Sequence, residues 1–212
     1  TTFTDLKVGT GATIESNGNA TLGIVTAKSF HGSGAGLTGI TAEFDPDAQE
    51  NLYAGTDAGK CSGSDNCYNV AIGYHAGCKI GNSSSQGDDN VFLGREAGVN
   101  VDAGIANIHI GYFAGCQNQS GHNNVAVGKQ SLRSLATGNN NVALGNQAGC
   151  LSQAQGNTFL GSYAGRNLVS GCCNIVIGCG AQVPLPNEDK QLAIGIADNN
   201  WIYGNANWNV GI

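Results

Sequence analysis

Basic residues are scarce in this chain. Nine lysine and arginine residues are spread over 212 positions without forming a run, and the net charge is −6. The chain therefore lacks the positive patch that binds phosphate backbones or anionic membrane surfaces, and we expect no nucleic-acid partner. Charged residues amount to 11% and hydrophobic residues to 41%, a composition that favours a folded chain over a disordered one.

Long hydrophobic runs and methionine are absent. No apolar stretch approaches the roughly 18 to 20 residues that cross a bilayer, so we expect a soluble segment without membrane insertion. The chain does not open with the charged and apolar regions of a secretory signal. Because there is no methionine, the start codon must lie outside the chain. We interpret the sequence as a piece of a longer protein.

Glycine is abundant, with 34 residues, and a short phrase recurs about every 17 residues. The phrase reads Asn, apolar, any residue, apolar, Gly, as in NVALG at residues 141–145. Its first residue is Asn51, Asn69, Asn90, Asn107, Asn124, Asn141, Asn157 and Asn174, with Gln191 in a degenerate ninth copy. Its fifth residue is always glycine: Gly55, Gly73, Gly94, Gly111, Gly128, Gly145, Gly161, Gly178 and Gly195.

Each phrase predicts a short β-strand. Apolar second and fourth positions alternate around a variable third, which is the period of two of a strand. The glycine ends the strand where the chain turns with a positive φ or passes close to another backbone. Third-position residues are expected to face outward against a sister chain: Ala71, Phe92, His109, Ala126, Ala143 and Phe159.

The fixed period predicts an all-β fold, a parallel β-solenoid with coils of about 17 residues. Coils stack at about 4.8 Å, so nine coils would extend roughly 40 Å. The first-position asparagines could then form a ladder of side-chain amides. One coil buries few side chains, and at about 0.8 kcal/mol per methylene this gain barely offsets the entropy of ordering the coil. We therefore expect several chains to associate.

Three copies of the phrase carry a resemblance to a known family. NVAIGYHAG (69–77), NVAVGKQSL (124–132) and NVALGNQAG (141–149) resemble the head repeats of trimeric autotransporter adhesins, the YadA-like left-handed parallel β-roll. The likeness covers about residues 51 to 182 and implies a left-handed coil and a homotrimer of chains packed side by side. The chain departs from this family in its longer period and in its cysteines.

The flanking segments resemble a second group. VGTGATIESNGNATLGIVTAKSFHGSGAGLTGIT (8–41) is similar to segments of phage tail fibres, especially from phages of marine cyanobacteria. NNWIYGNANWNVGI (199–212) resembles the passage leading into their C-terminal region. The resemblance implies a homotrimer at the virion surface, with other fibre or virion proteins and a host-surface glycan or protein as partners.

These observations predict three parts and a structural function. Residues 1–45 would be a turn-rich fibre linker, 46–182 the solenoid, and 183–212 degenerate coils and a cap leading to a further fibre region. The segment would contribute length, stiffness and host attachment without catalysis. The head of a bacterial trimeric adhesin is the nearest alternative, and a fibre-borne glycan depolymerase is the alternative of another class. The depolymerase would need clustered acids, whereas the fifteen acidic residues are scattered.

The eight cysteines are compatible with either a metal site or disulfides. No CxxC pair occurs, and Cys78, Cys116 and Cys150 recur immediately after an Ala-Gly pair, as the repeat does. We expect structural thiols or disulfides and no metal. Cys61 and Cys78 lie 17 residues apart, one coil, and are the candidate disulfide. Cys116 and Cys150 lie two coils apart, which at about 10 Å is too far to bridge.

Candidate catalytic and cofactor-binding residues are few. GAGLTG at residues 34–39 matches the GxGxxG pattern, but no helix and no βαβ unit are expected around it, so we expect no nucleotide cofactor. The histidines, His31, His75, His109 and His122, fall at four different repeat positions or linkers. Asp45 and Asp47 flank a proline and suit a turn or helix cap better than a calcium site or an acid-base role. We expect Trp201, Tyr203 and Trp208 to cap the last coil, with sugar binding as the alternative.

Overall fold

The computed structural model describes residues 12–14, 20–22, 49–81, 86–197, 199–205, 207 and 210–211. The chain divides into two compact units, Thr1–Ala42 and Glu43–Ile212. In the first unit, β1 (Ala12–Ile14) pairs antiparallel with β2 (Ala20–Leu22). The rest of the predicted linker, including the GxGxxG match, His31, Asp45 and Asp47, lies outside the described residues.

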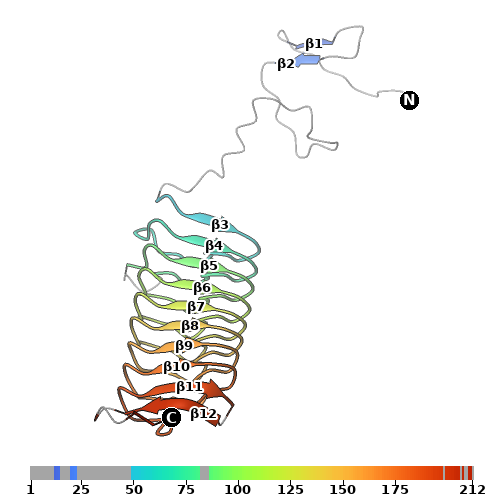
Figure 1. Ribbon diagram of the computed structural model, residues 1–212. Coiled ribbons are helices and arrows are strands. Elements are labelled where there is room, and N and C mark those ends of the chain that lie inside the picture. Colours follow the sequence, from blue (N-terminus) through green and yellow to red (C-terminus); the bar gives the residue numbers. More distant parts are fainter. Residues whose placement is uncertain are drawn as a thin grey trace. The chain divides into compact units, whose positions relative to one another are not determined.

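The second unit is built on one 11-stranded sheet whose strands follow one another in chain order (Figure 1). Most strands contain only three residues, because the phrase supplies only three between its asparagine and its glycine. They are β3 (Leu52–Ala54), β4 (Val70–Ile72), β5 (Val91–Leu93), β6 (Ile108–Ile110), β7 (Val125–Val127), β8 (Val142–Leu144), β9 (Thr158–Leu160) and β10 (Ile175–Ile177), followed by β11 (Leu192–Ile196), β12 (Asn199–Gly204) and β13 (Val210–Gly211).

The fold is an all-β parallel solenoid of about eight turns with coils of about 17 residues, as the sequence predicted. Strands β3 to β11 pair in parallel with equal phrase positions opposite each other, as Val125 opposite Val142. Each side chain therefore lies over its counterpart in the next coil. No helix occurs in the described part of the chain, so none there is long and apolar enough to cross a membrane.

The third phrase position faces the interior, and the prediction that it faces outward is wrong. In a single chain, the side chains at this position in β4 to β11 are fully buried: Ala71, Phe92, His109, Ala126, Ala143, Phe159, Val176 and Ala193. The reason is the Ala-Gly pair that follows six of the strands, β3 to β6, β8 and β9. A Cβ atom on Gly98 would lie 2.5 Å from the Phe92 ring, so the bare glycine makes room for an inward side chain.

The interior is a thin column that divides into two apolar clusters. One contains Ala71, Ala76, Ile80, Phe92, Ala97 and Val101, with Tyr53 packed against it. The other runs from Ala114 to Ala193 and includes Leu132, Leu135, Phe159 and Leu168. Between them, His109 and Asn118 place buried polar side chains in the same coil. The apolar core is therefore interrupted at one level of the stack.

The parallel stack ends at β11. Strand β12 pairs antiparallel with β11, and β13 pairs antiparallel with β12. Trp201 and Tyr203 lie on β12 and remain 59% and 48% exposed. Trp208 lies outside the described residues. Strand β12 thus occupies the edge of β11 to which another parallel coil would otherwise be added.

Candidate functional site

The outer face of the sheet carries a continuous row of aliphatic side chains. With the third position inside, the second and fourth positions of every strand point outward, and all but Thr158 among them are apolar from β3 to β11. The most exposed are Ile72 (40%), Ile108 (38%), Leu144 (41%) and Ile175 (44%). We call this row the aliphatic face. Its register follows from the parallel pairing, which stacks equal positions.

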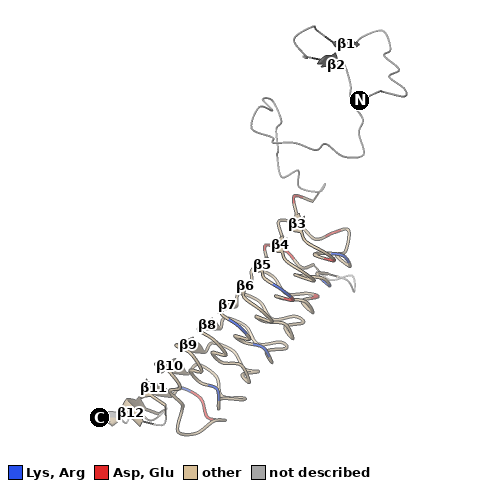
Figure 2. Ribbon diagram, turned by 90° about the vertical axis from the view of Figure 1, so that its right-hand side faces the viewer, with Lys and Arg blue, Asp and Glu red and all other residues tan. Residues whose placement is uncertain are grey.

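Charge is excluded from this face. Strands β3 to β12, whose residues are all described, contain no Asp, Glu, Lys or Arg. Figure 2 shows the charged residues on the turns that project away from the strands. A contiguous exposed apolar surface rimmed by polar turns is typical of a protein-protein interface.

Behind this face, the phrase asparagines form hydrogen-bonded ladders. From Asn69 to Asn174, the backbone N–H of each phrase asparagine donates to the side-chain oxygen of the phrase asparagine one coil earlier, at 2.8–3.0 Å. The side-chain amides repeat this contact at 3.0–3.2 Å between Asn51, Asn69, Asn90, Asn107, Asn124 and Asn141 and again between Asn157 and Asn174. The same amide groups also bond across their own coil, as Asn124 Nδ2 does to Gly138 O at 2.8 Å.

The asparagine ladder has one gap. The coil between Asn141 and Asn157 is one residue shorter, with a spacing of 16 residues. The side-chain nitrogen of Asn157 is buried without a hydrogen-bond partner, although its oxygen still accepts two bonds from Asn174. The gap leaves the coil that begins at Asn157 with one side-chain hydrogen bond fewer to the preceding coil.

The phrase glycines form a second ladder, in which backbones touch. From Gly55 to Gly178 their φ angles lie between +118° and +140°. A Cβ atom built on Gly55 would lie 2.7 Å from the carbonyl oxygen of Gly73, one coil away. The position therefore requires glycine both for its left-handed conformation and for the close approach of coils.

The side chains of Cys61, Cys78, Cys116 and Cys150 are free thiols. The backbone N–H of Cys61 donates to the carbonyl of Cys78 at 2.8 Å, so these two residues lie on adjacent coils. Burial, reinforced by the neighbouring Cys61 thiol, raises the pKa of Cys78. Burial likewise raises the pKa values of Cys116 and Cys150. Among the described residues, no group of three or more His, Cys, Asp or Glu is placed to hold a metal ion.

The three described histidines stay apart and have different environments. His75 Nε2 lies 2.9 Å from Asp57 Oδ2, and Lys60 Nζ lies 2.8 Å from the other oxygen of that carboxylate. The hydrogen bonds from Lys60 and then from His75 lower the pKa of Asp57. His122 Nδ1 accepts the backbone N–H of Ile105 at 3.1 Å. His109 is fully buried beside Phe92, with ring centroids 5.2 Å apart.

The turn after the phrase glycine carries an aromatic and cationic edge that the sequence analysis did not identify. The ring of Tyr74 stacks on that of His75 at 4.0 Å between centroids. One coil further, the Arg95 guanidinium lies 5.1 Å from the centre of the Tyr112 ring. The signal in the sequence was the sixth phrase position, where Tyr74, Arg95 and Tyr112 follow one another in successive coils.

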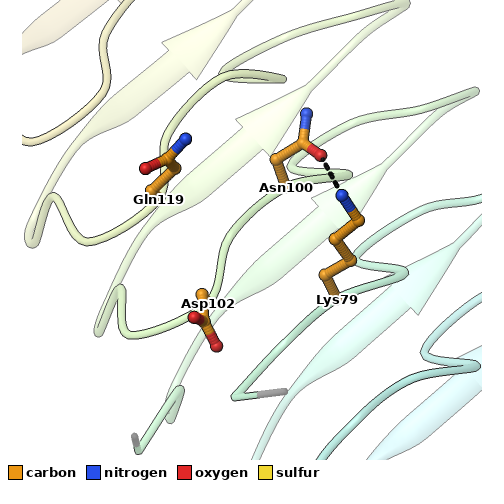
Figure 3. Close-up of a pocket in the computed structure, with 4 residues that line it drawn as sticks. All are labelled: Lys79, Asn100, Asp102 and Gln119. Carbon is orange, nitrogen blue, oxygen red and sulfur yellow. Dashed lines mark hydrogen bonds between the residues drawn. The ribbon is translucent and has the colours of Figure 1, made fainter. Parts of the chain in front are cut away.

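A shallow polar pocket lies on another turn of the solenoid (Figure 3). Lys79, Asn100, Asp102 and Gln119 line it, and Lys79 Nζ donates to Asn100 Oδ1 at 2.9 Å. Asn100 Nδ2 in turn donates to the carbonyl of Cys116 at 2.7 Å. These groups offer donors and acceptors to a hydroxyl-rich ligand, and none of them forms a nucleophile and base pair.

Fold and surfaces together define a class: a parallel β-solenoid repeat protein with an exposed aliphatic face. Comparisons with protein-family models, with curated proteins and with solved structures found no match.

Proposed function

We propose that the chain is a structural segment of a phage tail fibre, in which three copies pack side by side as left-handed β-rolls and contribute to host attachment. It is a virion-surface component without catalytic activity. The observation that carries the proposal is the aliphatic face. A fibre segment needs a surface that joins identical chains along its whole length, and this face follows the stacking direction through the parallel strands β3 to β11.

Association is favoured by the energetics of the single chain. Four of the exposed aliphatic side chains, Ile72, Ile108, Leu144 and Ile175, are 38–44% accessible to water. Removing apolar surface from water contributes about 25 cal/mol per Å². Since the thin interior holds few large side chains, burial of the aliphatic face is the main hydrophobic contribution still open to the chain. Three copies around one axis would cover all three faces and close the assembly.

The choice of a trimer and of a fibre comes from the two resemblances. The phrases resemble trimeric adhesin heads, and residues 8–41 and 199–212 resemble phage tail fibre segments. A stack braced by asparagine and glycine ladders suits a stiff rod. Three copies of a weak binding surface would raise avidity by about 10² to 10⁴ without a strong single site.

Light scattering coupled to size-exclusion chromatography tests the assembly. The expected mass is three times the chain mass of 21.5 kDa. Ile108→Lys, on the aliphatic face, should shift the population to monomers. Val169→Lys is the matched control, because Val169 has the same 38% exposure but lies on a turn. A monomeric parent, or equal effects of the two variants, would contradict the proposal.

Binding to cells tests the attachment role. Fluorescently labelled protein should bind marine cyanobacterial cells of a susceptible strain, and Ile108→Lys should bind at least about tenfold more weakly through lost avidity. Antibody against the chain should label fibres on phage particles in electron micrographs. Labelling of a bacterial envelope in place of phage fibres would favour the adhesin alternative.

A further inference from the structure

The first two coils bring two thiols together. The backbone N–H of Cys61 donates to the carbonyl of Cys78 at 2.8 Å, which places one residue over the other in adjacent coils. The same pattern holds on both sides, since Gly59 N–H donates to Ala76 O at 3.1 Å and Gly63 N–H to Ile80 O at 3.0 Å. Neighbouring strands lie about 4.8 Å apart, which is within the Cα separation of about 4.4–6.8 Å that a disulfide spans.

Cys116 and Cys150 do not lie on adjacent coils. Cys116 and Cys150 are buried, and the coil that carries Arg133 lies between them: Gln117 N–H donates to Arg133 O at 3.2 Å and Ser134 N–H to Cys150 O at 3.1 Å. The Cys67 thiol donates to the carbonyl of Asp65, two residues away. Cys61 and Cys78 thus occupy facing positions on successive coils.

The location of the pair matters for stability. Among the described strands, β3 forms the edge of the 11-stranded sheet and pairs with β4. Its inward residue, Tyr53, is only partly buried, whereas the inward residues of the next coils are fully buried. In the described part of the chain, the coil of residues 51–68 therefore has a neighbouring coil on one side, and it has little apolar burial. Stability in a solenoid depends on the interfaces between neighbouring repeats, so a cross-link reinforces most a coil that has only one such interface.

We propose that Cys61 and Cys78 are a disulfide-forming pair that locks the first coil onto the second under oxidising conditions. The oxidant is a small-molecule disulfide. The exposed Cys61 thiolate attacks one sulfur of that molecule, whose S–S bond breaks, and the released thiolate takes up the proton that Cys61 has lost. The Cys78 thiolate then attacks the Cys61 sulfur and releases the second small thiolate with the other proton. Two protein thiols are oxidised and one small disulfide is reduced to two thiols.

The bond restrains opening of the coil. It closes a loop between residues 61 and 78, which removes conformational freedom from the opened state. The amides that cross between the first two coils, those of Gly59, Cys61 and Gly63, should then exchange with solvent about tenfold or more slowly after oxidation. Amides of central coils, such as that of Val142, should be unaffected.

Mass spectrometry after treatment of the full chain with oxidised glutathione is the direct test. Trypsin and chymotrypsin cut after Lys60, Tyr68, Tyr74 and Lys79, so fragments 61–68 and 75–79 stay joined only through a disulfide. A Cys67→Ser background removes the second cysteine of the first fragment. The expected product is the joined pair of fragments, two hydrogen atoms lighter than the sum of the reduced fragments.

Matched variants and isotope labelling sharpen the result. Cys61→Ser should abolish the joined fragments and the slower exchange, whereas Cys179→Ser, at another exposed cysteine, should leave both intact. Circular dichroism of each variant checks that it folds. In an equal mixture of light and heavy chains, joined fragments should be only light-light or heavy-heavy. Glutathione on each thiol without joined fragments, or light-heavy pairs, would overturn the proposal.

Discussion

The side-chain amide of Asn124 donates to the side-chain oxygen of Asn107 at 3.1 Å and to the carbonyl of Gly138 at 2.8 Å. Its own oxygen accepts both the backbone N–H and the side-chain amide of Asn141 at 3.0 Å. This fully buried side chain thus bonds to the coils before and after its own, and its bond to Gly138 joins the beginning and the end of its own coil. The repeated asparagine therefore stabilises the stack in the way a backbone hydrogen bond stabilises a sheet.

Asn124→Ala should destabilise the chain by about 3 kcal/mol or more, because it leaves several buried donors and acceptors without partners at about 1–3 kcal/mol each. Asn157→Ala should cost less, since the Asn157 side-chain nitrogen has no partner to lose. Gln117→Ala, at an exposed amide, is the surface control and should stay within about 0.5 kcal/mol of the parent. Urea unfolding midpoints would measure all three, and equal losses at Asn124 and Asn157 would contradict the ladder's role.

The sequence was sufficient to predict the coil and its period, because asparagine and glycine are demanded at fixed positions by hydrogen bonding and by backbone conformation. It was insufficient to predict which side of the strand is inside. A period of two gives two faces, and here both carry apolar residues: Val142 and Leu144 on one, Ala143 on the other. The signal that decides is the glycine of the Ala-Gly pair after six of the strands, since a Cβ on Gly149 would collide with the inward Phe159 ring.

Gly145→Val should damage the fold well beyond the roughly 1 kcal/mol typical of a helix glycine. Its φ is +140°, and a Cβ atom there would lie 2.5 Å from the carbonyl carbon and oxygen of Gly161. The strain cannot relax, because the obstacle is the backbone of the next coil. Loss of the cooperative thermal transition, followed by circular dichroism, is the expected result.

A second glycine with a positive φ separates the effect of backbone conformation from the effect of steric crowding. Gly156 has φ +70°, and the nearest atom to an added Cβ is the end of the Cys173 side chain at 3.2 Å. The equivalent position in the preceding coil is Asn140, whose φ is +58°. Gly156→Asn should therefore melt within a few degrees of the parent. If Gly145→Val melted equally well, the close approach of the glycine backbones would not matter for stability.

Acid should weaken the fold through His109. Both ring nitrogens are buried without hydrogen-bond partners, and burial lowers the pKa of His109 to about 3 from its ordinary 6.5. Between these values the unfolded chain binds a proton that the folded chain does not, so stability is complete above pH 6.5 and falls as the pH drops toward 3. At 1.36 kcal/mol per pKa unit, the loss of stability is on the order of 5 kcal/mol when the pH reaches 3.

The substitution His109→Phe should remove this contribution. Phenylalanine already occupies the same inward position at Phe92 and Phe159, so the ring fits a coil of this kind. The variant should be more stable than the parent at neutral pH, because two unsatisfied buried nitrogens disappear. Urea unfolding of the parent and the variant at pH 7.5 and pH 4.5 isolates the contribution of His109 to stability, since both proteins contain the same carboxylates. An unchanged pH dependence in the variant would show that other groups cause it.

Two adjacent residues separate folding from assembly. Ala143 is fully buried inside the coil, whereas Leu144 is 41% exposed on the aliphatic face. Ala143→Arg would place a charged side chain in the thin interior with no partner, so the chain should lose its cooperative transition. Leu144→Arg keeps the interior intact and adds charge only to the outer face. It should retain the strand signal in circular dichroism while the mass from light scattering falls from three chains toward one.

Each variant has an outcome that would contradict its prediction. A Leu144→Arg protein that remained trimeric would show that the aliphatic face is not the contact between chains. A cooperative, correctly folded Ala143→Arg protein would show that the third position is not in the core.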